Sequence, residues 1–195
     1  MSRHFTSLTP EYFESMFQGT EDPWNLETSA YEKAKHDHTV RMLGSGEYRH
    51  AFEVGCARGM LTCLLAPAVQ SLLAIDVSGT ALRAARKRCA FYKHVMFANM
   101  QFPAQAPESD FDLIVLSEVV YYWDDTDIRT AAAWVADHLL PGGVIILVHW
   151  LGETDYPQSG DEAVDKLQDA LTGCVRIERA ERRGEYRLDV WRRTP

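Results

Sequence analysis

The spacing of apolar residues along the chain changes near residue 46. Before that point apolar side chains recur at helical intervals, and two helices are predicted, over residues 10–19 and from about 29 to 43. Thr9 provides a capping hydroxyl before a proline, and Gly44-Ser45-Gly46 ends the second helix. From Tyr48 onward short apolar runs alternate with helical segments, which is typical of an α/β protein.

The alternating part predicts a mostly parallel sheet covered on both faces by helices. The first expected strand ends at Val54, and the others span residues 71–77, 95–98, 111–116, 144–149, 174–180 and 185–192. The expected helices span residues 59–66, 79–91, 127–140 and 161–171, with Ser78 capping the second and Asp161 the last. The final two strands alternate apolar and polar residues, so we expect an antiparallel pair at a sheet edge. We predict one Rossmann-like α/β domain, residues 46–195, preceded by a helical lid, residues 1–45.

Composition limits the partners. The chain has 195 residues, 46% hydrophobic and 25% charged, which fits one globular domain. A net charge of −8 argues against nucleic acid as the main partner. The basic runs at residues 83–88 and 182–183 are interpreted as solvated surface. Without an apolar leader or a long apolar run, we expect a soluble, cytoplasmic protein with no membrane span.

The four cysteines do not indicate a metal or redox site. They are Cys56, Cys63, Cys89 and Cys174, and no two of them form a C-x-x-C pair. Isolated cysteines are typical of a reducing compartment. The helical histidines have no other potential metal ligands at suitable spacing in the sequence, so we expect no metal site.

Candidate chemistry is concentrated at residues 51–61, where an apolar strand, a Gly55-x-x-x-Gly59 loop and a helix follow one another. Asp76 ends the next apolar run, where an acid can accept hydrogen bonds from ribose hydroxyls. The spacing is neither G-x-G-x-x-G nor a phosphate-binding loop with a Lys-Ser/Thr pair. A nucleoside without phosphates fits better, and S-adenosylmethionine is the common one. The alternative is an ordinary strand-to-helix turn.

Three motifs carry a resemblance to a known group of enzymes. The E-x-G-x-x-x-G loop with its distal Asp76 resembles motif I of class I methyltransferases. Residues 111–122 look like their motif IV, and Pro141-Gly142-Gly143 looks like their motif V region. With the D-P-W-N element at residues 22–25, most of the chain resembles the nodulation protein S family. That family comprises S-adenosylmethionine-dependent N-methyltransferases, typified by one that modifies chitooligosaccharide signals.

The resemblance implies a cofactor site for S-adenosylmethionine, with S-adenosylhomocysteine as product. Asp76 would hold the ribose, and Asn99, where the superfamily usually has an acid, could accept from the adenine amino group. Lys35 would pair with the methionine carboxylate, or else is a solvated surface lysine. The implied cofactor residues are Trp24, Tyr31, Lys35, Glu53, Gly55, Cys56, Gly59, Asp76, Val77, Asn99, Met100 and Ser117.

Methyl transfer from a sulfonium is an in-line displacement in which the protein mainly orients the reactants. An amine acceptor must be neutral, so a base is expected at the carboxyl ends of the fourth and fifth strands. The candidates are Glu118, Tyr121 and His149. The alternatives are a capping or sheet-end role for Glu118, a core tyrosine, and a hydrogen-bonded structural histidine. Tyr121, Trp123 and Trp150 either stack on a sugar or fill the core.

The expected activity is N-methylation of an amino sugar or chitooligosaccharide-like small molecule by a monomer or homodimer. Three alternatives stay open. They are O-methylation of a natural product, a non-catalytic protein that binds S-adenosyl nucleosides, and an NAD-dependent reductase, which the glycine spacing disfavours.

Overall fold

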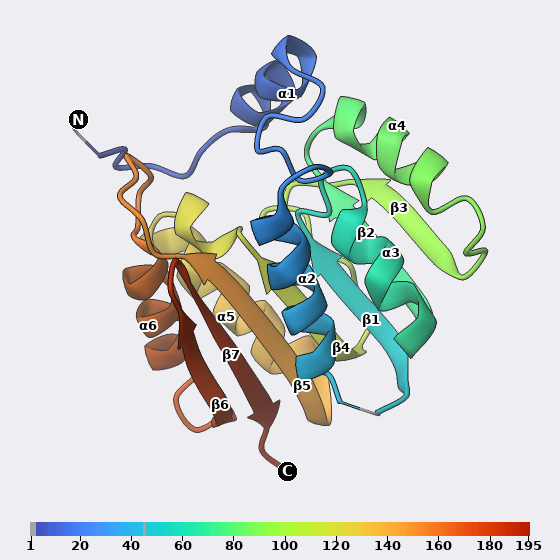
Figure 1. Cartoon of the computed structure of the whole chain (residues 1–195). Helices are drawn as coiled ribbons and strands as arrows, with labels where there is room; N and C mark the ends of the chain where they lie inside the picture. Colours follow the sequence, from blue (N-terminus) through green and yellow to red (C-terminus); the bar gives the residue numbers. More distant parts are fainter. Residues whose placement is uncertain (1–2, 45) are drawn as a thin grey trace. The chain divides into compact units, whose positions relative to one another are not determined.

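The computed structural model describes residues 3–44 and 46–195, and the chain forms two compact units. The N-terminal unit comprises Thr9–Gln101, and the C-terminal unit comprises residues 3–8 together with Phe102–Pro195. Met1, Ser2 and Ser45, on which expectations about the N-terminus and the end of the second helix fall, lie outside the described residues. The division at residue 46 into lid and domain stays a prediction. Figure 1 shows the elements of both units.

The N-terminal unit is a three-stranded parallel sheet with four α-helices in the residues that the structure describes. Its elements are α1 (Pro10–Gly19), α2 (Ala30–Met42), β1 (Tyr48–Val54), α3 (Met60–Leu65), the 3₁₀ turn η1 (Ala66–Ala68), β2 (Val69–Asp76), α4 (Gly79–Arg88) and β3 (Val95–Asn99). β2 pairs in parallel with both β1 and β3. Helix α1 packs against α4, and α2 packs against α3.

Strand register brings the chemical residues of this unit to one edge. Val54 lies opposite Ile75, so the glycine loop begins beside the end of β2. Asp76 lies opposite Asn99 at the ends of β2 and β3. The carboxyl ends of parallel strands are where open α/β sheets bind ligands.

The C-terminal unit combines one parallel and two antiparallel strand pairs. Its elements are β4 (Phe111–Ser117), the 3₁₀ turn η2 (Val120–Tyr122), α5 (Asp125–His138), β5 (Leu139–Trp150), α6 (Gly160–Ala170), β6 (Val175–Arg183) and β7 (Tyr186–Arg193). β5 pairs in parallel with β4 and antiparallel with β7, and β6 completes the antiparallel pair with β7. The predicted α/β class, with mostly parallel strands and a C-terminal antiparallel pair, is confirmed. In the described part of the chain, no helix is both long and apolar enough to cross a membrane.

The fifth strand begins earlier than predicted. Helix α5 ends at His138, and β5 starts at Leu139 instead of Val144. The pairing of β4 with β5 shifts register between Phe111 and Leu113, so the stretch through Gly142 (φ +76°) forms an irregularity inside the strand. The Pro-Gly-Gly sequence was expected to separate helix from strand, and it instead lies within the strand.

Of the helix caps predicted at Thr9, Ser78 and Asp161, only one is present in the structure. Ser78 caps α4, because its hydroxyl accepts from the Ala81 N–H at 3.0 Å. Asp161 was wrong as the cap of α6: Ser159 accepts from the Glu162 N–H in a complete capping box. Asp161 instead accepts hydrogen bonds from arginine side chains. Thr9 precedes α1 but makes no side-chain capping bond.

Candidate active site

The glycine loop turns over the end of β2 through main-chain hydrogen bonds. The N–H groups of Gly55 and Cys56 both donate to the Ile75 carbonyl, at 2.8 and 2.9 Å. Gly55 has φ +73°, and Ala57, which carries a side chain, has φ +46°. Left-handed geometry at a non-glycine residue is uncommon and persists where the surroundings enforce it. Here the Asp76 carboxylate does so, accepting from the Ala57 N–H at 2.8 Å.

Gly59 closes the loop against α4. Its φ is +78°, and a Cβ built there would lie 3.1 Å from the Ala85 Cα and 3.3 Å from the Cys89 Sγ. The structure shows that the tight neighbour is α4. A side chain at this position would push the loop and α4 apart.

Two buried carboxylates lie beneath the loop. Glu53 is 2% exposed, and burial raises its pKa to about 7, with the Asp76 charge adding to the shift and the Thr62 hydroxyl opposing it. Burial also raises the pKa of Asp76 to about 6, against hydrogen bonds from the Ser78 and Ala57 main chain. Glu53 Oε2 has no hydrogen-bond partner among the described residues. Such a pair favours a ligand that brings hydroxyl donors and positive charge.

The third strand end supplies an oriented amide. Asn99 Nδ2 donates to the main-chain carbonyls of Asp76 and Val77, at 3.0 and 2.8 Å. Because the amide nitrogen serves the main chain, the oxygen is the atom that remains to accept from a ligand. Val77 and Met100 are half-buried at the same strand ends, where they offer apolar contact to a flat ring.

Lys35 is not a surface lysine. It is 3% exposed, and its Nζ pairs with Glu32 Oε1 at 2.9 Å and lies 5.1 Å from the centre of the Tyr31 ring. The solvated alternative is therefore wrong. Trp24 is half-buried and packs edge-to-face on Phe17, with 5.4 Å between ring centres. The cofactor roles of Trp24, Tyr31 and Lys35 stay predictions.

Sequence reasoning missed Arg58, which joins the glycine loop to the segment after α1. Arg58 is 8% exposed, and its guanidinium donates to the Glu21 carbonyl, to Glu21 Oε1 at 3.0 Å and to Glu27 Oε1 at 2.9 Å. Arg88 donates to the Arg58 carbonyl at 3.0 Å and also pairs with Glu27. The run at residues 83–88 is thus not purely solvated. The D-P-W-N element lies within the segment, residues 21–27, that these arginines hold.

A cavity of about 300 Å³ lies beside this contact. Its lining contains no residue predicted to bind the cofactor. It is formed by Phe17, Glu21, Arg58, Thr80, Ala81, Arg83, Ala84 and Lys87.

In the C-terminal unit, Glu118 follows β4 in a left-handed conformation with φ +57°. Its N–H donates to the Val148 carbonyl at 2.8 Å. Its Oε2 accepts from the Tyr121 hydroxyl at 2.5 Å and from the Trp150 N–H at 2.9 Å. Glu118 therefore has the sheet-end contact that was considered as an alternative, and it caps no helix among the described residues. A backbone strain of about 1–3 kcal/mol at such a position is typical of functional sites.

His149 is fully buried instead of being presented at the sheet edge. Its Nε2 accepts from the Val120 N–H at 3.2 Å, and its ring packs edge-to-face on Tyr121. A ring nitrogen that accepts from an amide is unprotonated, so this bond favours the neutral imidazole. The structure thus gives His149 the hydrogen-bonded geometry of the structural alternative, and its catalytic role stays a prediction.

The aromatic candidates divide by burial. Tyr121 is 5% exposed, and burial, followed by the Glu118 charge, raises its pKa well above the usual range. Trp123 is 7% exposed and packs against Phe102, so it is a core residue. Trp150 and Tyr156 are half-buried, and Tyr156 stacks on Tyr121 with 5.3 Å between ring centres. Ser117 is half-buried at the end of β4, as expected.

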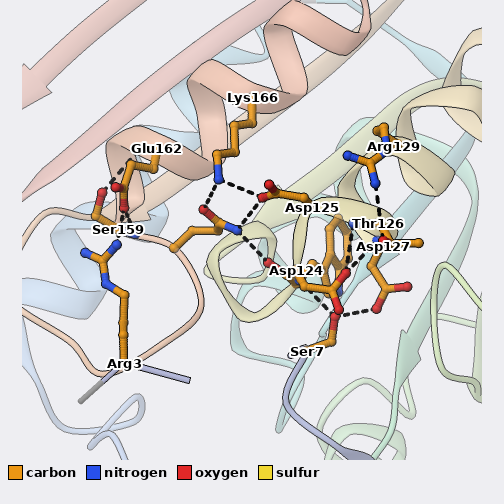
Figure 2. A network of polar contacts seen from close by, with 12 residues as sticks. Arg3, Ser7, Asp124, Asp125, Thr126, Asp127, Arg129, Ser159, Glu162 and Lys166 are labelled. Carbon is orange, nitrogen blue, oxygen red and sulfur yellow. Dashed lines mark hydrogen bonds and ion pairs between the residues drawn. The ribbon is translucent and has the colours of Figure 1, made fainter. Parts of the chain in front are cut away.

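An N-terminal strap, residues 3–8, holds this side of the unit (Figure 2). The Ser7 hydroxyl donates to Asp127 Oδ2 at 2.5 Å and accepts from the Asp124 N–H at 2.9 Å. The Leu8 N–H donates to the Tyr122 carbonyl at 2.9 Å. The strap therefore fixes the start of α5 and the turn η2 that carries Tyr121. Nothing in the local spacing of these residues signals the contact.

A second part of the network in Figure 2 links the start of α5 to α6 and the residue before its cap. Gln158 is 4% exposed and donates to the Trp123 carbonyl at 3.3 Å and to Asp125 Oδ1 at 3.0 Å. Lys166 donates to both Asp125 and Gln158. The described residues contain no cluster of His, Cys, Asp and Glu that could hold a metal ion.

The glycine loop, the buried carboxylates and the parallel strands define the fold of class I methyltransferases. The same fold occurs in the N-methyltransferase NodS from Bradyrhizobium japonicum WM9 in complex with S-adenosyl-L-homocysteine. That structure matches with a TM-score of 0.83 and 26% identity over 95% of this chain and 98% of that chain. A putative methyltransferase from Pseudomonas syringae matches with a TM-score of 0.72 and 31% identity over 85% of this chain and 100% of that chain.

The chain belongs to the Nodulation protein S (NodS) family, whose sequence model matches residues 16–149. Nodulation protein S from Sinorhizobium fredii is 37% identical over 128 residues, 65% of this chain. The matched stretch spans 59% of that relative's length. The resemblance inferred from the motifs is confirmed.

Proposed function

We propose that this protein is an S-adenosylmethionine-dependent N-methyltransferase. The observation that carries the proposal is the pair of buried carboxylates, Glu53 and Asp76, beneath the glycine loop. The glycine spacing of this loop differs from that of loops that bind a pyrophosphate. Adenosine offers ribose hydroxyls to a carboxylate, and the methionine part brings an ammonium and a sulfonium. A phosphorylated nucleotide would instead place negative charge against two acids, which is unfavourable.

The cofactor residues have separate tasks in this proposal. Asp76 accepts from the ribose hydroxyls in its ionised form, and Glu53 faces the positive charge of the methionine part. The Asn99 amide oxygen accepts from the adenine amino group, and Val77 and Met100 flank the ring. The bound cofactor supplies a methyl group already activated by its sulfonium.

The acceptor chemistry is assigned to the C-terminal unit. An amine must lose its proton before it can attack, and we assign Glu118 as the group that takes it. Two hydrogen bonds, from Tyr121 and from the Trp150 N–H, orient the carboxylate. Tyr121 is a positioning residue because its hydroxyl already donates to Glu118. The half-buried rings of Trp150 and Tyr156 supply flat apolar faces, which suit a sugar ring bearing the amine.

A lid role for residues 1–45 completes the proposal. The contacts of Arg58 and Arg88 with Glu21 and Glu27 join this part to the cofactor loop. Glu21 is largely exposed, so its ion pair is weak and the contact can open. Limited proteolysis should cut within residues 20–28 more slowly when S-adenosylhomocysteine is present. Equal cleavage rates with and without it would contradict the lid.

The test of activity is a methyl-transfer assay with mass-spectrometric product analysis. The acceptor panel contains amino sugars, partly deacetylated chitooligosaccharides and their fully N-acetylated counterparts as matched controls. The proposal expects methylation of the free amines and none of the N-acetylated compounds. If methyl groups were found only on hydroxyl oxygens, N-methylation would be contradicted and the protein would be an O-methyltransferase. No transfer to any acceptor, despite cofactor binding, would favour a non-catalytic binding protein.

A further inference from the structure

A glutamate on α1 holds the first turn of α4. Glu14 Oε2 accepts from the Ser78 hydroxyl at 2.6 Å and from the Thr80 N–H at 3.2 Å. Glu14 Oε1 accepts from the Thr80 hydroxyl at 2.6 Å and from Gln18 Nε2 at 2.9 Å. These bonds, with Ser78 contributing the most, lower the pKa of Glu14 to about 2. Glu14 is therefore ionised at every pH at which the protein would be used.

Ser78 lies between Glu14 and Asp76. Its hydroxyl donates its single proton to Glu14 and accepts from the Ala81 N–H at 3.0 Å, so both functions of the hydroxyl are fixed. Its main-chain N–H donates to Asp76 Oδ1 at 2.8 Å. Ser78 is fully buried, so water cannot easily replace a lost hydrogen-bond partner of its hydroxyl. A continuous hydrogen-bonded path thus runs from α1 to the carboxylate assigned to the ribose.

We propose that Glu14 is a positioning residue for cofactor binding: by fixing Ser78, it orients the Asp76 carboxylate toward the ribose and ties α1 to the nucleoside side of the site. This inference rests on the proposed function, because it takes Asp76 as the ribose-binding acid. Asp76 keeps Oδ2 on the Ala57 N–H of the glycine loop, so both carboxylate oxygens are held by main-chain donors. The acid is therefore preorganised before the ligand arrives.

Glu14 also acts on Asp76 through its charge. Three titratable groups are coupled to Asp76 by charge. The charge of Glu14 on α1 raises the pKa of Asp76, and the Asp76 charge in turn raises the pKa values of Glu53 on β1 and Cys56 in the loop. Burial is the largest cause of the raised pKa of Asp76, and the Glu14 charge adds to it. Removing that charge should lower the pKa of Asp76. A contact that only packed α1 against α4 would change stability and leave S-adenosylhomocysteine affinity unchanged.

The experiment compares wild type with Glu14→Gln, Glu14→Ala and Glu11→Gln. Glu11 is the matched control, because it lies on the same helix and its side chain is exposed. The Asp76 carboxyl resonance is titrated by ¹³C NMR in the ligand-free protein and assigned with Asp76→Asn. S-adenosylhomocysteine affinity is then measured by calorimetry from pH 5 to pH 8. Thermal unfolding is followed in parallel.

The proposal expects the Asp76 midpoint to move to lower pH in Glu14→Gln and to stay in place in Glu11→Gln. At pH 8, Glu14→Ala should bind S-adenosylhomocysteine about tenfold more weakly, since a charge-assisted hydrogen bond has been lost. A lower unfolding temperature of Glu14→Ala with unchanged S-adenosylhomocysteine affinity would overturn the proposal, whatever the Asp76 midpoint. Failure of the wild type to bind contradicts the proposed function, whereas the ligand-free titration tests the Glu14–Asp76 coupling by itself.

Discussion

The carboxylates of the two units differ in their hydrogen-bond partners and in how burial affects them. In the N-terminal unit, Glu53 and Asp76 are buried, their pKa values are raised to about 7 and about 6, and Glu53 Oε2 has no partner among the described residues. In the C-terminal unit, Glu118 accepts from the Tyr121 hydroxyl and the Trp150 N–H. In the N-terminal unit, Glu53 depends on a ligand for compensation, although Asp76 is held by main-chain donors. In the C-terminal unit, Glu118 is already oriented by the protein. Mutations in the two units should therefore affect binding and chemistry separately.

The largest expected effect separates chemistry from cofactor binding. Glu118→Gln keeps an oxygen that can accept from Tyr121 and Trp150 but cannot take a proton from an amine. The rate of methyl transfer should fall about 10²- to 10⁴-fold, as for loss of a general base. S-adenosylhomocysteine affinity should stay within about twofold, because Glu118 is not an implied cofactor residue and the N-terminal unit supplies all of those except Ser117. Calorimetry and the transfer assay on one preparation measure both, and equal losses in both would contradict the division.

The next prediction concerns the packing of the glycine loop. Gly59→Ala adds a Cβ 3.1 Å from the Ala85 main chain in a left-handed conformation. Gly173→Ala is the matched control, because its φ is +83° and nothing lies within 4 Å of the added atom. The control should lose about 1–2 kcal/mol of unfolding free energy, and Gly59→Ala about 1–3 kcal/mol more from overpacking. Equal losses in urea denaturation would mean that α4 does not constrain the loop.

The pH dependence of stability should reflect the buried pair. A folded pKa above the unfolded value means that the folded state binds more protons, so stability falls as pH rises through that window. For the ligand-free protein, this window runs from about pH 4, the ordinary carboxyl pKa, to about pH 7, the raised pKa of Glu53. Below it, Glu14, with a pKa lowered to about 2, has the opposite effect, because its contribution to stability is lost as the pH falls, so maximum stability is expected near pH 4.

Glu53→Gln tests whether Glu53 causes part of this fall in stability with rising pH. The variant should lose less stability between pH 5 and pH 8 than wild type, by on the order of 1–3 kcal/mol in urea denaturation. An unchanged slope would show that Glu53 is ionised without penalty in the ligand-free protein.

The smallest expected effect lies in the strap. Ser7→Ala removes hydrogen bonds to Asp124 and Asp127 and should cost about 1 kcal/mol of unfolding free energy and lower kcat, with cofactor affinity unchanged. Arg3→Ala breaks a half-exposed ion pair with Glu162 and should change stability by at most about 0.5 kcal/mol. A larger effect of Arg3→Ala than of Ser7→Ala would show that the strap is held by its exposed end.

Local sequence was sufficient for features that are themselves local. The Gly55 and Gly59 spacing, the acid at the end of β2 and the Ser78 cap all follow from neighbouring residues, and so do most element boundaries. The cap of α6 was also predictable, because Ser159 and Glu162 have capping-box spacing.

Contacts between distant residues were not predictable in this way. The bonds of Glu14 to Ser78, of Arg58 to Glu27 and of Ser7 to Asp127 depend on how helices pack, and no local pattern marks them. The burial of His149 has the same origin, since Tyr121 of η2 and Gly160 at the start of α6 lie against it. Long-range packing decides which polar residues meet, and therefore which candidates are oriented for chemistry.

The most direct test of the central claim is a calorimetric titration of wild type and Asp76→Ala with S-adenosylhomocysteine, S-adenosylmethionine, NAD and ATP. The account predicts binding of the two S-adenosyl compounds only, with affinity falling at least about tenfold in the variant, because a buried carboxylate that accepts ribose hydroxyls is lost. Wild-type protein that bound neither S-adenosyl compound, or a variant that bound both as tightly as wild type, would contradict it.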